Sequence, residues 1–234
     1  MTLDVDLWIW PLDQPDRVTG FSRLLSGDET ARAVRFVRPQ DKLRYITGRG
    51  RMREIIGQYM GLHPDAVSFS YGAQDKPELP GGPAFNLSHA NGWAALIVAP
   101  AAADRDIQLG VDIEAERPVE DGVAARFFSP SEYASLSALP ATDWKGGFFR
   151  CWTRKEAVIK ATGGGLSTPL DSFDVSLMPG DAAQIKRVSG DLAPVAAWSL
   201  THLDLAPRFV GAIAAVTHGR QVRVSVKETS LPLW

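Results

Sequence analysis

The predicted elements of this 234-residue chain occur in a similar order twice, which limits the possible folds more than any other feature. Each half reads as a strand, then helices, then further strands. The segments 36–39 (FVRP) and 53–56 (REII) of the first half are echoed by 127–130 (FFSP) and 155–158 (KEAV) of the second. The sequence therefore predicts two similar halves, which an old duplication would explain.

The individual elements follow from residue periodicity and from turn residues. Alternating apolar residues in LDVDLWIW predict a first strand, and the stretch from about Gly27 to Met60 predicts a helix broken near Pro39. Ser129 and Glu132 have the spacing of a capping box at a helix start. The small, polar segment 101–108 is the expected boundary, which divides the chain into 1–104 and 105–234. We expect further strands at 66–72, 85–90, 93–100, 109–118, 172–178, 196–205 and 209–216.

Composition and charge exclude several classes of protein. Hydrophobic residues make up 45% of the chain and the formal net charge is -2, so nothing attracts the whole molecule to nucleic acid or to an anionic membrane. Cys151 is the only cysteine, which excludes an intramolecular disulfide and a thiolate zinc cluster. The acidic N-terminal segment lacks the features of a signal peptide. We therefore expect a cytoplasmic protein that binds neither nucleic acid nor membrane.

One segment is strongly basic although the chain is slightly acidic. Asp41 is the only acidic residue between residues 32 and 53. These could form an ordinary solvated helix surface, or they could form a local anion-binding site. The basic residues are Arg32, Arg35, Arg38, Lys42, Arg44, Arg49, Arg51 and Arg53.

The motif GVDIE contains two carboxylates with the spacing of a strand. Side chains alternate in a strand, so Val111 and Ile113 are expected in a core. Asp112 and Glu114 would then share the other face, with Cα atoms roughly 6.5 Å apart. Two such carboxylates can flank a hard cation such as Mg²⁺ or Mn²⁺. A strand with a polar outer face has the same pattern, so this motif alone leaves both interpretations open.

The stretch CWTRKEAVIKATGGG reads as a helix that ends in glycines. Glu156 and Lys160 lie four residues apart and therefore share a helix face. An ordinary surface pair has the same spacing and contributes roughly 0.2–0.5 kcal/mol. The glycines exceed what a helix stop requires and allow a close backbone approach. They follow the helix instead of preceding it, so they do not form a phosphate-binding P-loop.

Six motifs occur together in one order. They are DKP (75–77), FNLSHA (85–90), GVDIE (110–114), FFSPSEY (127–133), WTRKEAVIKATGGGL (152–166) and PLDSF (169–173). Together they closely resemble the 4′-phosphopantetheinyl transferase superfamily, of the long Sfp-like type with two similar halves in one chain. The resemblance implies an α+β fold of two similar α/β subdomains with pseudo-twofold symmetry. Each subdomain would be a small, mostly antiparallel sheet packed with helices, and the active site would lie at their interface.

The resemblance also implies a reaction and the residues that perform it. The family moves the phosphopantetheine arm of coenzyme A onto a serine of an apo acyl or peptidyl carrier protein and releases 3′,5′-ADP. Its carriers belong to fatty acid, polyketide or nonribosomal peptide biosynthesis. The family's metal is Mg²⁺, which Mn²⁺ can replace, and its ligands match Asp112, Glu114 and Glu156. Glu156 would also be the general base, and Lys160 would act on the phosphate. Coenzyme A contacts match Arg32, Arg44, Arg49, Lys76, Ser88, His89 and Lys160. The basic segment would face the phosphates, and Asp75 stands where the family usually has glycine.

The carrier protein is expected to dock between the halves, near the helix that begins at Ser129. Phe127, Phe128 and Tyr133 would either contact it or pack in the core, and Glu132 would either cap the helix or take part in docking. We expect a monomer, because one chain contains both halves of the site.

Two other functions share some of these residues. One is a magnesium-dependent nucleotide phosphohydrolase, and the other is a catalytically inactive module that binds coenzyme A or a carrier protein. The presence of Asp112, Glu156 and Lys160 together favours the transferase over the inactive module.

Overall fold

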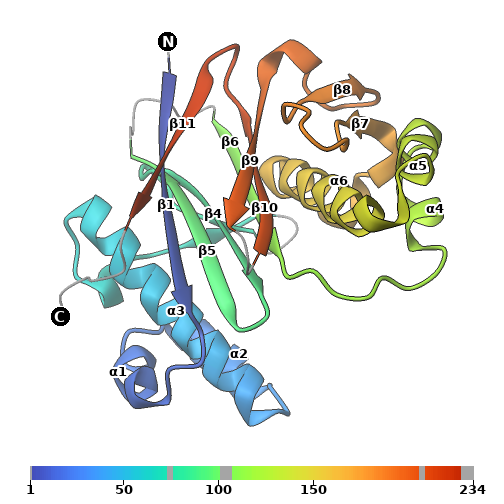
Figure 1. The fold of residues 1–234 in the computed structure, drawn as a ribbon. Coiled ribbons are helices and arrows are strands. Elements are labelled where there is room, and N and C mark those ends of the chain that lie inside the picture. The colour runs from blue at the N-terminus through green and yellow to red at the C-terminus, as the bar shows by residue number, and fades with distance from the viewer. Residues whose placement is uncertain (1, 73–75, 101–106, 206–208, 228–234) are drawn as a thin grey trace.

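Two sheets lie face to face at the centre of the molecule, and a long helix covers the outer face of each (Figure 1). The computed structural model describes residues 2–72, 76–100, 107–205 and 209–227. The first sheet has the strand order β11-β1-β5-β4, and the second has the order β6-β10-β9. Helix α3 packs on the first sheet and helix α6 on the second. The predicted α+β architecture with small, mostly antiparallel sheets is therefore confirmed.

The elements of the first half agree with most of the predicted ones. The segment 66–72 is an exception, because only two of its residues form a strand. The helices are α1 (Val18–Ser22), α2 (Gly27–Val34) and α3 (Pro39–Met60), so the predicted break near Pro39 is confirmed. The strands are β1 (Thr2–Pro11), β2 (Ser70–Tyr71), β3 (Pro77–Glu78), β4 (Ala84–Ala90) and β5 (Trp93–Ala99).

The second half adds two strands that were not predicted, β8 and β11. Its helices are α4 (Val123–Phe127), α5 (Pro130–Ser137) and α6 (Ala141–Thr162). Its strands are β6 (Gln108–Glu114), β7 (Phe173–Val175), β8 (Ile185–Val188), β9 (Trp198–Leu205), β10 (Phe209–Val216) and β11 (Gln221–Lys227). Strand β11 pairs in parallel with β1 and so extends the first sheet. The expected boundary falls on residues 101–106, outside the described residues, and the division into 1–104 and 105–234 stays a prediction.

The two long helices have matching ends. Helices α3 and α6 both have 22 residues, and each is followed by a glycine in the left-handed region, Gly61 (φ 62°) and Gly163 (φ 70°). A short helix with a capping box precedes each of them. The box is formed by Ser26 and Glu29 before α3 and by the predicted pair Ser129 and Glu132 before α6.

Side chains of β4 join the two sheets where β4 runs beside β6. The Asn86 side-chain oxygen accepts a hydrogen bond from the Val111 amide at 2.9 Å. The Ser88 hydroxyl accepts one from the Ile113 amide at 3.4 Å. Asn86 and Ser88 are both buried. Their side-chain oxygens accept hydrogen bonds from two backbone amides of β6 that would otherwise have no partner. This junction fixes the position of the GVDIE motif relative to the first half.

Candidate active site

Helix α6 and strand β6 approach each other closely, and this contact brings the predicted acidic and basic residues together. Gly110 makes the approach possible, because a Cβ atom there would lie 2.1 Å from the Ala157 carbonyl oxygen of α6. Val111 and Ile113 lie in a core, as predicted, and that core also contains residues of the first sheet. Asp112 faces α6 and is only 5% exposed, so its face of the strand is covered by a helix instead of by solvent.

Lys160 reaches from α6 to the carboxylate of Asp112. Its ammonium nitrogen lies 2.7 Å from Asp112 Oδ1 and 2.9 Å from the hydroxyl oxygen of Ser88. The Ser88 hydroxyl in turn donates to Asp112 Oδ1 at 3.1 Å. Residues from β4, β6 and α6 therefore form one connected polar group, and the first-half residue Ser88 is part of it.

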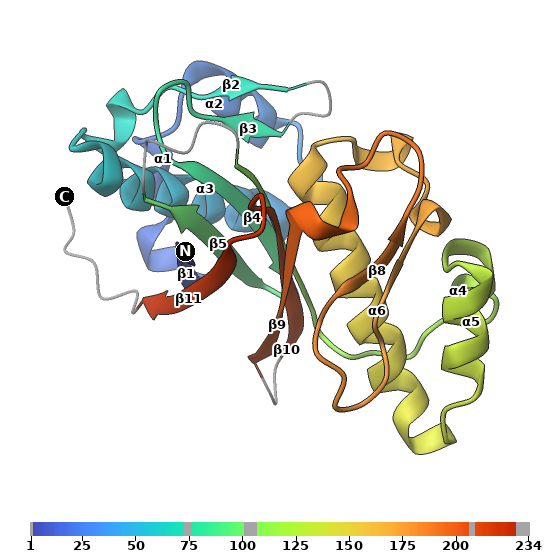
Figure 2. The same cartoon turned by 90° about the horizontal axis from the view of Figure 1, so that it is seen from above.

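A cavity of about 980 Å³ lies between the two halves. Seven of the predicted site residues line it: Arg32, Arg44, Arg49, Lys76, His89, Glu156 and Lys160. Ser88 and Asp112 are buried behind this lining and reach it through Lys160. Figure 2 shows how α3 and α6, which carry several of these residues, lie on opposite sides of the sheets.

The first-half wall of the cavity is cationic. Arg44 forms two hydrogen bonds of 2.8 Å to the carboxylate of Asp13, which holds its guanidinium in place. Arg49 lies near the rings of both Tyr45 and Tyr71, with its Cζ atom 5.8 and 5.9 Å from their centroids. These cation–π contacts hold the guanidinium beside the two rings, and its Nη1 atom also lies 3.9 Å from Glu29 Oε1.

The prediction that the whole basic segment faces this cavity is wrong, because Arg32, Arg44 and Arg49 line it and the other five basic residues do not. The clearest exceptions are Arg51 and Arg53. Both are buried inside the first half, at 4% and 2% exposure. Arg51 pairs with Glu54 at 2.7 Å and Arg53 with Glu29 at 2.7 Å. Buried charges require such partners, so these two arginines are used by the fold. The segment is therefore opposed by Asp13, Glu29 and Glu54 in addition to Asp41.

Lys76, which immediately precedes β3, and His89 of β4 both line the cavity. The Lys76 ammonium donates to three backbone carbonyls, of Leu109 (3.1 Å), Lys160 (2.7 Å) and Ala161 (3.0 Å). It therefore joins the first half to the end of α6, where helix carbonyls lack partners. Burial lowers the pKa of Lys76 to about 8. Asp75, which precedes Lys76, lies outside the described residues.

Two carboxylates of the site, Asp112 and Glu156, have raised pKa values. Burial raises the pKa of Glu156, and Asp112 raises it further while Lys160 opposes the shift. Burial likewise raises the pKa of Asp112, with Lys160 opposing and Glu114 adding to the increase. Asp112, Glu114 and Glu156 therefore influence one another electrostatically.

The described residues suit a cation beside Asp112, although they do not form a complete metal-binding site. They contain no group of three or more His, Cys, Asp or Glu side chains arranged to hold a metal ion. Glu114 is bound instead to Arg117, at 2.6 Å. Asp112 Oδ2, however, is buried and has no hydrogen-bond partner among the described residues. An unpaired buried carboxylate oxygen costs free energy that a bound cation would remove.

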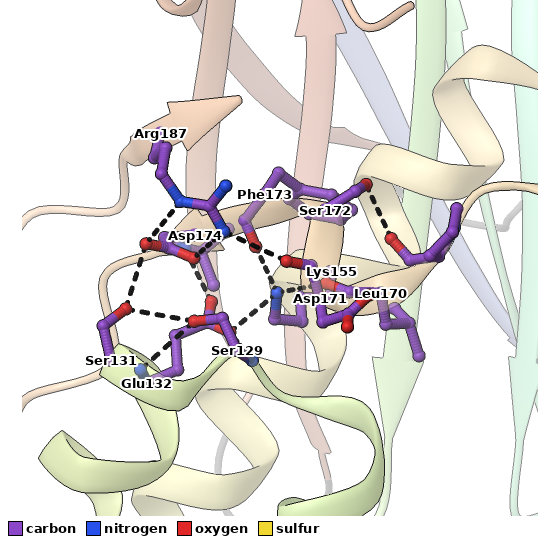
Figure 3. A network of polar contacts seen from close by, with 12 residues as sticks. Ser129, Ser131, Glu132, Lys155, Leu170, Asp171, Ser172, Phe173, Asp174 and Arg187 are labelled. Carbon is purple, nitrogen blue, oxygen red and sulfur yellow. Dashed lines mark hydrogen bonds and ion pairs between the residues drawn. The ribbon is translucent and has the colours of Figure 1, made fainter. Parts of the chain in front are cut away.

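The FFSPSEY motif has a mixed outcome. Phe128 is 3% exposed and packs against Phe148, so it belongs to the core. Phe127 lines the cavity and packs edge-on against Trp152. Tyr133 is 44% exposed. Glu132 is buried and forms the predicted capping box with Ser129, so it is not available for docking (Figure 3).

Asn86 and Arg126 are among the residues of the site that were not predicted. Asn86 lines the cavity and also holds β6, and its place in FNLSHA was the only signal for it. Arg126 of α4 adds a cation to the second-half wall. It immediately precedes FFSPSEY, so its positive charge could be read from the sequence, but its orientation toward the cavity could not.

Comparisons with known proteins agree with this arrangement. The family model of the 4′-phosphopantetheinyl transferase superfamily matches residues 108–216. A model described as 4′-phosphopantetheinyl transferase, N-terminal, matches residues 13–101. The 4′-phosphopantetheinyl transferase HetI from Nostoc sp. is 39% identical over 93% of this chain and 90% of its own length.

Two further relatives come from Bacillus subtilis. The 4′-phosphopantetheinyl transferase Sfp is 34% identical over 71% of this chain and 72% of its own length. The transferase ffp is 35% identical, with 70% of each chain covered. The chain therefore belongs to the 4′-phosphopantetheinyl transferase superfamily and is a transferase. Within the described parts of the chain, no helix combines the length and the apolar character that crossing a membrane requires.

Proposed function

We propose that this protein transfers the 4′-phosphopantetheine group from coenzyme A to a serine of an apo acyl or peptidyl carrier protein and releases 3′,5′-ADP. The observation that supports this most directly is the cavity, with cations of the first half facing Glu156 and Lys160 of the second. Coenzyme A carries three phosphate groups, which arginine and lysine bind through charge-assisted hydrogen bonds. A cavity of about 980 Å³ also suits a ligand of that size.

The residues divide into those that bind and those that react. Arg32, Arg44, Arg49 and His89 would hold the phosphates and the adenine end of coenzyme A, and Lys76, whose ammonium is bound by three carbonyl oxygens, would add positive charge beside them. Asp112, Glu114 and Glu156 would hold Mg²⁺ or Mn²⁺. The unpaired Asp112 Oδ2 supports this ligand set. When bound, the ion would neutralise charge on the pyrophosphate.

The transfer requires one proton to move and one phosphate bond to be exchanged. Glu156 accepts the proton of the serine hydroxyl, and its raised pKa makes it a better base than an ordinary carboxylate near neutral pH. The serine oxygen then bonds to the phosphorus of the phosphopantetheine, and the pyrophosphate bond to 3′,5′-ADP breaks. Lys160 lines the cavity and stabilises the negative charge that builds on the departing phosphate.

The oligomeric state and the cellular location that we propose rest on two separate observations. Both halves of one chain line the cavity, so a monomer would suffice for activity. Cys151 is buried and free, which suits the reducing cytoplasm.

The test is the intact mass of several apo carrier proteins after incubation with this protein, coenzyme A and Mg²⁺. We expect at least one carrier to gain one phosphopantetheine, and a chelator to abolish the gain. Release of 3′,5′-ADP or phosphate from coenzyme A in the absence of any carrier would favour a phosphohydrolase instead. Binding of coenzyme A with no modification of any carrier would favour an inactive binding module.

A further inference from the structure

Lys155 points away from the cavity, although the next residue, Glu156, lines it. Its side chain is fully buried, and its ammonium has three acceptors (Figure 3). These are Glu132 Oε2 at 2.8 Å and the carbonyl oxygens of Leu170 and Phe173, both at 2.6 Å. An ammonium has three donors, so every donor of Lys155 is used.

Glu132 is held as tightly at the other end of this ion pair. Its Oε2 atom accepts from the Ser129 amide at 2.9 Å, and its Oε1 atom accepts from the Val175 amide at 2.7 Å. The pair therefore ties the start of α5, the middle of α6 and strand β7 together. Removing one member of this ion pair would be costly, because the other charge would stay buried, without a partner and without water.

The segment that Lys155 holds is a wall of the cavity. Gly165, Thr168, Pro169, Leu170 and Asp171 all line it. This segment contains only two short 3₁₀ turns, so regular backbone hydrogen bonds do little to fix it.

A second anchor holds the same wall from outside. The Arg187 guanidinium donates to the Asp171 carbonyl oxygen at 3.0 Å and to both carboxylate oxygens of Asp174 (Figure 3). Ser131 of α5 also donates to Asp174, at 3.0 Å. Leu170 and Asp171 are thus held by one buried cation and one partly exposed cation.

The first half contains the same arrangement without a cavity beside it. Arg53, which corresponds to Lys155, binds Glu29 of the preceding capping box at 2.7 Å. It also donates to the carbonyl oxygens of Pro64 (3.2 Å) and Val67 (2.7 Å), just after its own helix. Residues 61–69 do not appear among the cavity lining. The shared task of both cations is to hold the chain that follows a long helix, and only Lys155 holds a wall that a ligand would touch.

We propose that Lys155 and Glu132 form a clamp that positions the cavity wall at residues 165–171 and thereby sets the affinity for coenzyme A. This inference rests on the proposed function for the identity of the ligand. Lys155 is a positioning residue, since it touches the wall and not the ligand. Loss of the clamp releases the wall, so it should weaken binding more than it slows the chemical step.

The test compares Lys155→Arg and Lys155→Met with Ser129→Ala. Arginine keeps the charge and can still reach Glu132, whereas methionine removes all three hydrogen bonds. Ser129→Ala removes a cap from α5, which costs about 1 kcal/mol, but leaves the Lys155 contacts in place. The Michaelis constant for coenzyme A, the turnover number and hydrogen exchange of residues 165–173 are measured at a temperature where each variant is folded.

We expect Lys155→Met to raise the Michaelis constant for coenzyme A by roughly tenfold, with a much smaller change in turnover. A tenfold change is what the loss of about one hydrogen bond between the released wall and coenzyme A would cause. Exchange of residues 165–173 should accelerate, and Lys155→Arg should restore part of both properties. The clamp is refuted if Ser129→Ala changes the Michaelis constant as much, or if the wall exchanges at the wild-type rate in Lys155→Met.

Two further measurements keep the inference testable. If Lys155→Met does not fold, Arg187→Ala removes only the outer anchor, and it should accelerate exchange at residues 165–173 and raise the Michaelis constant by a smaller factor. Unchanged exchange and affinity in that variant would count against the clamp. If the unaltered protein does not bind coenzyme A, the proposed function fails. The exchange experiment needs no ligand and still decides whether Lys155 fixes the wall.

Discussion

Replacing Gly110 by alanine should slow the reaction strongly, although the new methyl group would touch no substrate. A Cβ atom at this position would lie 2.1 Å from the Ala157 carbonyl oxygen and 2.4 Å from the Ala161 amide nitrogen. Both atoms belong to the backbone of α6, so no side-chain rotation can relieve the clash. Contacts between real Cβ atoms and such neighbours almost never fall below 3.0 Å, so α6 must move away from β6 by about 1 Å.

This shift acts directly on the polar group of the site. Lys160 lies 2.7 Å from Asp112 Oδ1, and a displacement of about 1 Å would break that contact and carry Glu156 out of position. A misplacement of this size can reduce turnover on the order of 100-fold. The overpacked contact should also lower the free energy of unfolding by about 1–3 kcal/mol.

The assay is the initial rate of carrier modification by mass, together with urea unfolding of the same samples. Gly20→Ala is the control, because a Cβ atom in that helix position meets nothing within 4 Å. The control should keep its turnover and should not lose stability. Wild-type turnover in a folded Gly110→Ala protein would refute the argument that the β6–α6 distance sets the geometry of the site.

Other perturbations test separate parts of the site. Glu156→Gln should keep the fold and lose most turnover in the mass assay; a rate like that of the wild type would exclude Glu156 as the base. Lys160→Met should lower turnover while leaving coenzyme A binding measurable by calorimetry, and little loss of activity would reduce Lys160 to a partner of the carboxylates. Because the pKa of Lys76 is lowered from 10.5 to about 8, the unfolded chain binds more protons than the folded one between these pH values. The free energy of unfolding should therefore gain a contribution that rises with pH in this window, and urea titrations of Lys76→Met should lack it. Arg53→Met should lower the free energy of unfolding by about 3–5 kcal/mol, because it removes the main partner of the buried Glu29; a loss below 1 kcal/mol would contradict this.

The features that the sequence predicted well depend on neighbouring residues. The turn between β4 and β5 is formed by Asn91 (φ 46°) and Gly92 (φ 77°), the two residue types that best tolerate positive φ in a hairpin. The capping box of Ser129 and Glu132 needs only four consecutive residues. The alternation in GVDIE correctly placed Val111 in the core, because a strand has a fixed period of two.

Features that depend on distant residues could not be predicted in this way. Strand β11 pairs with β1 more than 200 residues earlier in the chain, and no local pattern specifies that partner. The basic segment of α3 looked uniform, yet Arg53 points into the first half and Arg49 lines the cavity. A possible signal was the second capping box, because Glu29 of α2 needs a partner once it is buried.

The comparison of the halves explains why only the second one carries reactive residues. Glu54 follows Arg53 as Glu156 follows Lys155, so the two glutamates occupy corresponding places. Glu54, however, is bound by Arg51 at 2.7 Å and by Arg17 at 3.4 Å. Burial raises the pKa of Glu54 as it does that of Glu156, but the oxygens of Glu54 are occupied by two cations and are therefore not available to a substrate proton or a metal.

The second difference lies one helical turn further along. Lys160 follows Glu156 by four residues, whereas the residue four after Glu54 is Gln58, which is exposed and carries no charge. The first half has therefore kept the clamp of Arg53 and Glu29 but not the reactive pair. It contributes instead the cations of α3 that face the cavity. If this division holds, Arg51→Met should unfold or destabilise the protein without creating a second site, since the position of Gln58 still lacks a cation. Modification kinetics that showed two independent sites in that variant would contradict the argument.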